Sequence, residues 1–228
     1  MRVWRHNIGR VLWTLRGRRP IETANARAGL IGDRMSAATF KLLGLPGSLR
    51  KKSASRAVLQ TLKDALPAEV SMTIFELAEI PLYNEDFEDD KPAAVRALYD
   101  AVVACDGLVV LSPEYNHGMS GVLKNAIDWV SRPGYNSVLK DKPVCILTTS
   151  ESPLGGARAQ ADLHKMFLST LSRIALGREV SIGGTGKSVV DGRLVDAALL
   201  KRILTLVDAL LHEICLVQGR PSRANKGY

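Results

Sequence analysis

The feature that most constrains the fold is a strand–loop–helix pattern within residues 107–133. An apolar run at residues 107–111 predicts a buried strand, and a polar loop follows at residues 113–116. Residues 122–130 then carry apolar side chains at helical spacing. In an open α/β sheet, such a unit places a ligand at the carboxyl ends of the strands. Residues 40–62 have the same order, so the sequence predicts a cofactor crevice.

Strands and helices alternate along the rest of the chain. We expect strands at residues 40–45, 70–77, 107–111, 143–149 and near 178–182, and helices at residues 55–65, 93–104, 122–130, 157–171 and 196–217. This alternation predicts a parallel sheet with helices on both faces. Ligand loops after the first, third and fourth strands favour a flavodoxin-like α/β fold, a five-stranded parallel sheet in the order 2-1-3-4-5.

The positive charge is concentrated at the start of the chain. Of the formal net charge of +8, residues 1–34 contribute +6, and the remaining residues carry 23 basic and 21 acidic side chains. A nearly neutral domain argues against nucleic-acid binding. We expect residues 1–36 to be a disordered or non-native extension, with translation starting at Met35. The alternative is a basic amphipathic helix that binds a membrane or targets an organelle.

Residues 37–220 are expected to form one domain, followed by a short tail at residues 221–228. No apolar run is long enough to span a bilayer, so we expect no stable membrane insertion. Three cysteines lie in separate apolar segments, without metal-ligand spacing, and their odd number argues against a disulfide framework. We expect buried, reduced thiols, no metal site and a cytoplasmic protein.

The first candidate loop is GSLRKKSAS, residues 47–55. The N–H groups and dipole of a helix N-terminus attract an anion, and hydroxyls at Ser48, Ser53 and Ser55 add donors. Arg50 can bind phosphate oxygens bidentately. Without G-x-G-x-x-G, a terminal monophosphate is favoured over a dinucleotide pyrophosphate. The alternative is a serine helix cap beside a solvated basic cluster.

The second candidate loop is Pro113-Glu114-Tyr115-Asn116. Tyr115 offers a flat face and Asn116 a donor and an acceptor, which suits a planar heterocycle. Alternatively, Tyr115 caps the core and Asn116 is a turn residue. Glu114 taken alone is expected to be an exposed structural carboxylate. His117 lacks an orienting partner and is not expected to act as a general base.

Three motifs together resemble the NADPH-dependent FMN reductase family, which includes bacterial chromate and quinone reductases. They are residues 47–55, residues 113–116 with 121–129, and Ser150 with residues 155–160. The similarity covers about residues 41–217. Ser55 stands where the family has asparagine, and we expect weaker FMN binding as a result.

The resemblance implies a flavodoxin-like domain that holds FMN non-covalently. The implied phosphate-binding residues are Ser48, Leu49, Arg50, Ser53 and Ser55. The implied neighbours of the isoalloxazine ring are Pro113, Glu114, Tyr115 and Asn116 on one side and Ser150 on the other. No side chain is expected to be catalytic, because the flavin carries the chemistry.

The implied function is transfer of a hydride from NADPH or NADH through FMN to quinones or to other acceptors, such as free flavin, chromate or dyes. The alternatives are a flavodoxin-like electron carrier, disfavoured because the domain is nearly neutral, and a flavin-free interaction protein. The family suggests a homodimer or homotetramer. We expect contacts through helices 121–131 and 157–171, with Trp129, Arg158 and His164 facing the partner.

Residues 183–188, GGTGKS, resemble the end of a nucleotide-binding P-loop. The full motif would need glycine at position 181, which is Ser181. We therefore predict a simple turn there and no nucleotide hydrolysis.

Overall fold

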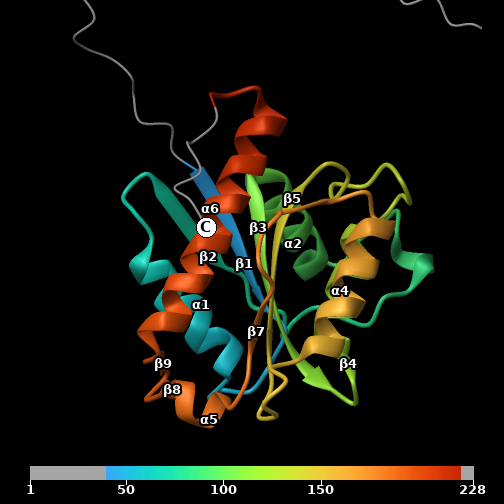
Figure 1. Ribbon diagram of the computed structural model, residues 1–228. Helices are drawn as coiled ribbons and strands as arrows, with labels where there is room; N and C mark the ends of the chain where they lie inside the picture. The colour runs from blue at the N-terminus through green and yellow to red at the C-terminus, as the bar shows by residue number, and fades with distance from the viewer. Residues whose placement is uncertain (1–39, 222–228) are drawn as a thin grey trace, which may run out of the picture. The chain divides into compact units, whose positions relative to one another are not determined.

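A computed structural model of the chain describes residues 40–221 (Figure 1). The predictions for the basic extension and for residues 222–228 lie outside this range. The main strands are β1 (Phe40–Pro46), β2 (Val70–Ile74), β3 (Gly107–Tyr115), β5 (Pro143–Thr149) and β7 (Val180–Ile182). The main helices are α1 (Ala54–Ala65), α2 (Ala93–Ala104), α3 (Gly121–Val130), α4 (Ala157–Ser169) and α6 (Ala197–Gln218).

Smaller elements connect these strands and helices. They are η1 (Glu85–Phe87), β4 (Gly118–Met119), β6 (Arg173–Ile174), α5 (Thr185–Ser188), β8 (Val189–Val190) and β9 (Arg193–Leu194). The glycine-rich segment therefore continues into a single helical turn, α5, where the sequence predicted a simple turn.

The parallel sheet has the predicted order. It runs β2-β1-β3-β5, and both β6 and β7 pair with β5 in parallel. The flavodoxin-like arrangement is confirmed, but the sheet has seven strands rather than five. One addition is β4, which pairs antiparallel with β3. The other is β6, which precedes β7 and, like it, pairs with β5.

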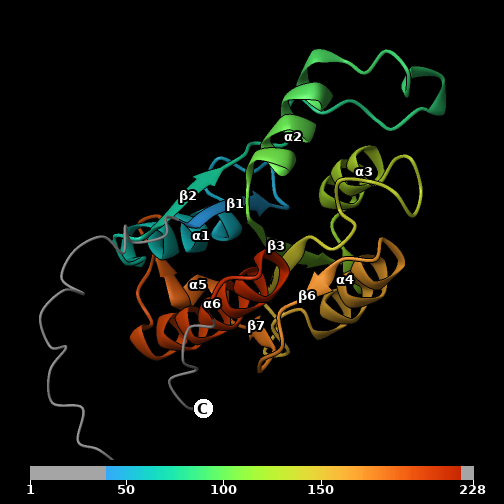
Figure 2. The same cartoon turned by 90° about the horizontal axis from the view of Figure 1, so that it is seen from above.

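Both faces of the sheet are covered by helices, as Figure 2 shows from above. Alternating strand residues point to opposite faces. Leu42, Val109 and Leu147 pack in one core layer with α1 and α6, whereas Leu43, Val110 and Ile146 pack in the other with α2, α3 and α4. This two-sided burial explains why the central strands read as continuous apolar runs.

The third strand is longer than predicted. It continues through Pro113 to Tyr115, where the sequence indicated a loop. Tyr115 pairs with Gly118, and Asn116 and His117 form the turn between β3 and β4 with φ of 48° and 67°. Two consecutive left-handed residues are what a tight β-hairpin requires. The second strand, in contrast, ends at Ile74, three residues earlier than predicted.

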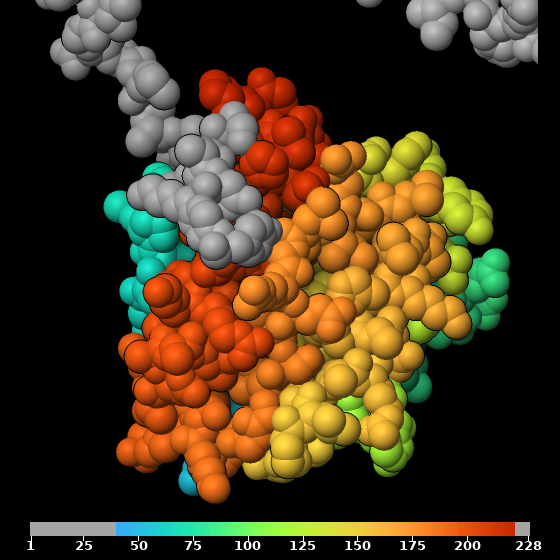
Figure 3. Space-filling model, in the orientation of Figure 1, coloured from blue at the N-terminus to red at the C-terminus, as the bar shows by residue number. Residues whose placement is uncertain are grey.

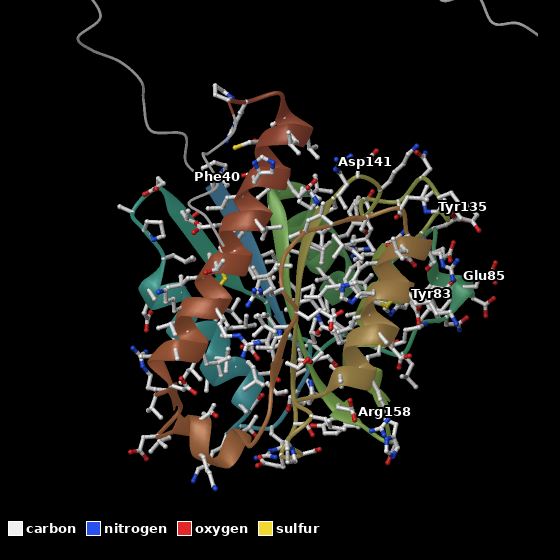
Figure 4. The ribbon with its side chains drawn as sticks, viewed as in Figure 1. Phe40, Tyr83, Glu85, Tyr135, Asp141 and Arg158 are labelled. Atoms are coloured by element: carbon white, nitrogen blue, oxygen red, sulfur yellow. The ribbon has the colours of Figure 1, made fainter. Side chains whose placement is uncertain are left out.

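The polar excursion after β2 is fastened to α3. The Pro81 carbonyl accepts hydrogen bonds from Asn125 Nδ2 and Trp129 Nε1, both at 2.8 Å, and the Tyr83 N–H donates to Asn125 Oδ1 at 2.7 Å. The Tyr83 ring, labelled in Figure 4, meets the indole edge-on at 5.1 Å. Trp129 is only 1% exposed, so the prediction that it faces an oligomer contact is wrong. No helix of residues 40–221 is long and apolar enough to span a bilayer.

Candidate functional site

A cavity of about 230 Å³ lies at the carboxyl ends of the central strands. These strand ends are at the lower edge of Figure 1. Its lining residues are Ser48, Arg50, Ser53, Ala54, Ser55, Pro113, Glu114, Tyr115, Thr149, Ser150, Glu151 and Thr185. The structure thus brings together the three predicted segments. Two predicted residues, Leu49 and Asn116, are exposed and are not part of this lining.

The loop after β1 is anchored between the two neighbouring segments. Gly47 is buried, and its N–H donates to the Leu111 carbonyl of β3 at 2.8 Å. Ser53 is the N-cap of α1 and accepts from the Arg56 N–H at 3.3 Å. The other first-turn N–H groups lack intrahelical partners. A helix N-terminus in this state favours an anion, and the exposed guanidinium of Arg50 adds a positive charge.

Ser55 supplies a test of whether the cavity fits a phosphate. Its side chain is 1% exposed, and Oγ has no hydrogen-bond partner among residues 40–221. Leaving a buried hydroxyl unpaired costs about 1–3 kcal/mol. A phosphate oxygen in the cavity would remove that cost, so the residue that replaces the family's asparagine is compatible with a phosphate ligand.

The end of β3 is held rigidly and presents one aromatic face. Ser112 Oγ accepts from the Ser120 N–H at 2.9 Å and donates to the Pro113 carbonyl at 2.8 Å. Ser120 Oγ in turn caps α3 by accepting from the Leu123 N–H. Tyr115 remains 48% exposed beside the cavity. An exposed ring on a fixed backbone can stack against a planar ligand.

Glu114 is not the exposed carboxylate that the sequence predicted. Its side chain is only 10% exposed, and Oε2 accepts from the N–H groups of Arg158 and Ala159 at 3.0 and 3.2 Å. The guanidinium of Arg158, labelled at one end of α4 in Figure 4, lies 3.7 Å from Oε1. Gly156, the N-cap of α4, has no side chain to cap the helix. Glu114, on strand β3, caps the N-terminus of α4 in its place.

Glu151 and Thr185 were missed by sequence reasoning. The Thr185 hydroxyl donates to Glu151 Oε1, and the Gly186 N–H donates to Oε2 at 3.1 Å. The pKa of Glu151 is lowered, chiefly by the hydrogen bond from Thr185, and further by the Gly186 N–H and by the nearby positive charge of Arg50. The site therefore contains an ionised carboxylate that joins the loop after β5 to α5. The partners of Glu151 lie 34 and 35 residues away in sequence. The GGTGKS segment, which contains both partners, was the one sequence feature that could have indicated this contact.

The cysteines take no part in this cavity. All three are free and buried, as predicted. Burial raises the pKa of Cys105 to about 11 and that of Cys145 to about 12. Neither is a thiolate near neutral pH, so neither is a nucleophile. Within residues 40–221, no group of three His, Cys, Asp or Glu side chains is placed to hold a metal ion.

Comparison with known proteins agrees with this geometry. Residues 40–187 match the NADPH-dependent FMN reductase family. The chain is 37% identical over 170 residues to a quinone reductase of Escherichia coli strain K12, covering 72% of this chain and 89% of that protein. It is 39% identical over 125 residues to a 2-hydroxy-1,4-benzoquinone reductase of Burkholderia sp., covering 55% of this chain and 68% of that protein.

Among solved structures, FerB of Paracoccus denitrificans, a flavoenzyme NAD(P)H:(acceptor) oxidoreductase, superposes with a TM-score of 0.70 at 29% identity. The alignment covers 77% of this chain and 97% of FerB. These findings confirm the predicted family and favour an enzyme over an electron carrier. The chain therefore belongs to the NADPH-dependent FMN reductase family, and it is an oxidoreductase with FMN as its cofactor and NAD(P)H as its co-substrate.

Proposed function

We propose that this protein reduces quinones with NAD(P)H, using FMN held in the cavity at the ends of β1, β3 and β5. The observation that carries the proposal is the position of the unpartnered Ser55 hydroxyl, which shares one cavity with Arg50 and Tyr115. When bound, FMN supplies the hydride chemistry. Two relatives are named as quinone reductases, which supports a quinone as the acceptor. Free flavin, chromate and dyes would be less selective acceptors.

Different residues of the cavity would bind the phosphate and the ring of FMN. Ser48, Ser53, Ser55 and Arg50 would bind the phosphate, while Tyr115 would flank the ring. The cavity of about 230 Å³ is smaller than the roughly 300–1,000 Å³ of pockets that enclose a whole ligand. We infer that it encloses the phosphate end and that the ring lies at its open edge beside Tyr115. A ring in that position would be accessible in turn to NAD(P)H and to the acceptor.

The phosphate assignment is tested by Arg50→Ala. Removing a charge-assisted contact of about 1.5–3 kcal/mol should weaken FMN binding by roughly 10- to 150-fold. Titration of the apoprotein with FMN, followed by flavin fluorescence, measures the Kd. Riboflavin, which has no phosphate, should bind wild type and variant equally. Arg96→Ala, at an exposed arginine outside the cavity, is the control. Wild-type FMN affinity in Arg50→Ala would refute the assignment.

The reaction itself is tested by kinetics. If NAD(P)H and quinone use the same exposed face of the ring in turn, initial rates should show ping-pong behaviour, with parallel double-reciprocal lines. Converging lines would mean that both substrates are bound together. The same assay with NADPH and with NADH measures the nucleotide preference.

We also propose that the protein assembles as a homodimer or homotetramer through α3 and α4. Leu168 on α4 is 63% exposed, and Arg158 presents 53% of its side chain. His164 is half-buried, with Nδ1 2.9 Å from the Gln160 carbonyl. Light scattering on wild type and on Leu168→Glu tests this assembly. A monomeric mass for the wild type would contradict it.

The proposed functional domain is residues 37–220, in a protein located in the cytoplasm. Three buried free thiols are compatible with a reducing compartment. Deletion of residues 1–36 should leave FMN binding and quinone reduction unchanged. Loss of either activity on deletion would show that the extension belongs to the functional unit.

A further inference from the structure

We propose that a second groove, next to the flavin cavity, binds a phosphorylated adenosine. The groove has a volume of about 590 Å³, and its lining residues are Lys51, Lys52, Ser53, Arg56, Ala57, Gln60, Val189, Asp191 and Gly192. The proposal rests on the proposed function, because the FMN phosphate at Ser53 is its reference point. The adenosine could come from NADPH, as its 2′-phosphoadenosine half, or from FAD bound in place of FMN, as its AMP half.

The charges of the groove favour a phosphate. The ammonium groups of Lys51 and Lys52 are exposed and have no hydrogen bond or ion pair within residues 40–221. Arg56 is partly neutralised by Glu76, at 3.2 Å. Asp191 is the one acidic side chain in the lining, so the cations exceed the anions. Two unpaired ammonium groups beside a concave surface form a site where an anion displaces only water and counterions.

The groove adjoins the flavin cavity. Ser53 lines both spaces, and the loop after β1 contributes Ser48 and Arg50 to one and Lys51 and Lys52 to the other. A ligand that extends past the FMN phosphate at Ser53 would therefore come next to the groove. The groove volume falls within the range for a pocket that encloses a small ligand, whereas the flavin cavity alone falls below it.

The opposite wall of the groove is a fixed hairpin. Asp191 and Gly192 form the turn between β8 and β9, with φ of 47° and 73°. The Leu194 N–H donates to Thr61 Oγ1 of α1 at 3.0 Å, and Arg193 pairs with Asp64 of the same helix. Figure 1 shows this hairpin beside α1, and Figure 3 shows the orange surface of this part of the chain at the lower left. The groove is thus formed before a ligand binds.

The test compares two double variants with the same change in net charge. Lys51→Gln/Lys52→Gln removes the groove lysines, and Lys63→Gln/Lys165→Gln removes two exposed lysines that line neither space. Calorimetry measures binding of adenosine 2′,5′-bisphosphate to the FMN-loaded proteins. Flavin fluorescence measures FAD and FMN binding to the apoproteins. Loss of two exposed cation–phosphate contacts should weaken binding by about tenfold.

The binding results either support or overturn the proposed adenosine site. Weaker bisphosphate binding in the groove variant alone supports the site with NADPH as the source, and weaker FAD binding with unchanged FMN binding supports FAD as the source. The proposal is overturned if both probes bind the groove variant as tightly as the wild type. It is also overturned if the control variant loses as much affinity, if FMN binding falls together with FAD binding, or if the wild type binds neither probe. Failure of FMN to bind the wild type would instead refute the proposed function.

Discussion

Adding one methyl group at Gly47 should disrupt both cofactor loops at once. A Cβ at this position would lie 2.7 Å from Ser120 Oγ, 3.2 Å from the Leu111 carbonyl oxygen and 3.2 Å from Pro113 Cδ. The Gly47 N–H is bonded to that same carbonyl, so the backbone cannot move away without losing a hydrogen bond. Gly47→Ala must therefore displace Ser120, the loop after β1, or both.

The magnitude follows from these contacts. Overpacking of a well-packed site costs about 1–3 kcal/mol. Ser120 is also the N-cap of α3, and loss of such a cap costs about 0.5–2 kcal/mol. Since the two costs overlap in part, we expect destabilisation by about 2–4 kcal/mol. For a domain of this size, each kcal/mol lowers Tm by about 2–4 °C, so Tm should fall by roughly 4–16 °C.

The matched control is Gly121→Ala, at the first residue of α3, where an added Cβ would have no neighbour within 4 Å. That variant should be neutral or slightly stabilised, because alanine restricts the unfolded chain. Thermal unfolding gives Tm for both apoproteins, and flavin fluorescence gives the FMN Kd. Gly47→Ala should also bind FMN at least several-fold more weakly. If it matched Gly121→Ala in both Tm and Kd, the packing reasoning would be refuted.

Four further substitutions or conditions test individual groups. Ser55→Ala removes an unpaired buried hydroxyl, so the apoprotein Tm should be unchanged or higher. The same variant should bind FMN about five- to tenfold more weakly, because a donor to the phosphate is lost. A lower Tm with an unchanged Kd for FMN would contradict this. Glu114→Gln should lower the unfolding free energy by about 1 kcal/mol in denaturant titrations, through a weaker cap on α4, and an unchanged midpoint would count against that role. Because the folded pKa of Glu151 is lowered, the ionised carboxylate stabilises the fold above its ordinary pKa of 4.5, and this stabilisation is lost as pH falls through the lowered pKa. The small difference in unfolding free energy between wild type and Glu151→Gln should therefore disappear in acid. A difference independent of pH would exclude this linkage. Iodoacetamide at pH 8 should leave Cys105 and Cys145 unmodified in the folded protein by mass spectrometry, in contrast to protein in urea.

The sheet order and the edge at which the site lies follow from the sequence pattern alone. Apolar runs of the lengths found at β1, β3 and β5 can be satisfied only by burial between two helical layers. The polar loops that follow parallel strands then meet at one edge, whatever the details of packing. For that reason the sequence pattern predicts that Ser48, Arg50 and Ser55 lie near Tyr115, as the structure shows.

The roles of individual polar side chains, in contrast, depend on contacts between elements that are far apart in the sequence. Trp129 is buried because its N–H meets a carbonyl 48 residues earlier in the chain, and Glu114 is held by N–H groups 44 and 45 residues later. Glu151 likewise depends on a helical turn that follows it by 34 residues. Periodicity reports which face of its own element a residue occupies, but a hydrogen bond across elements depends on distances that no local pattern contains.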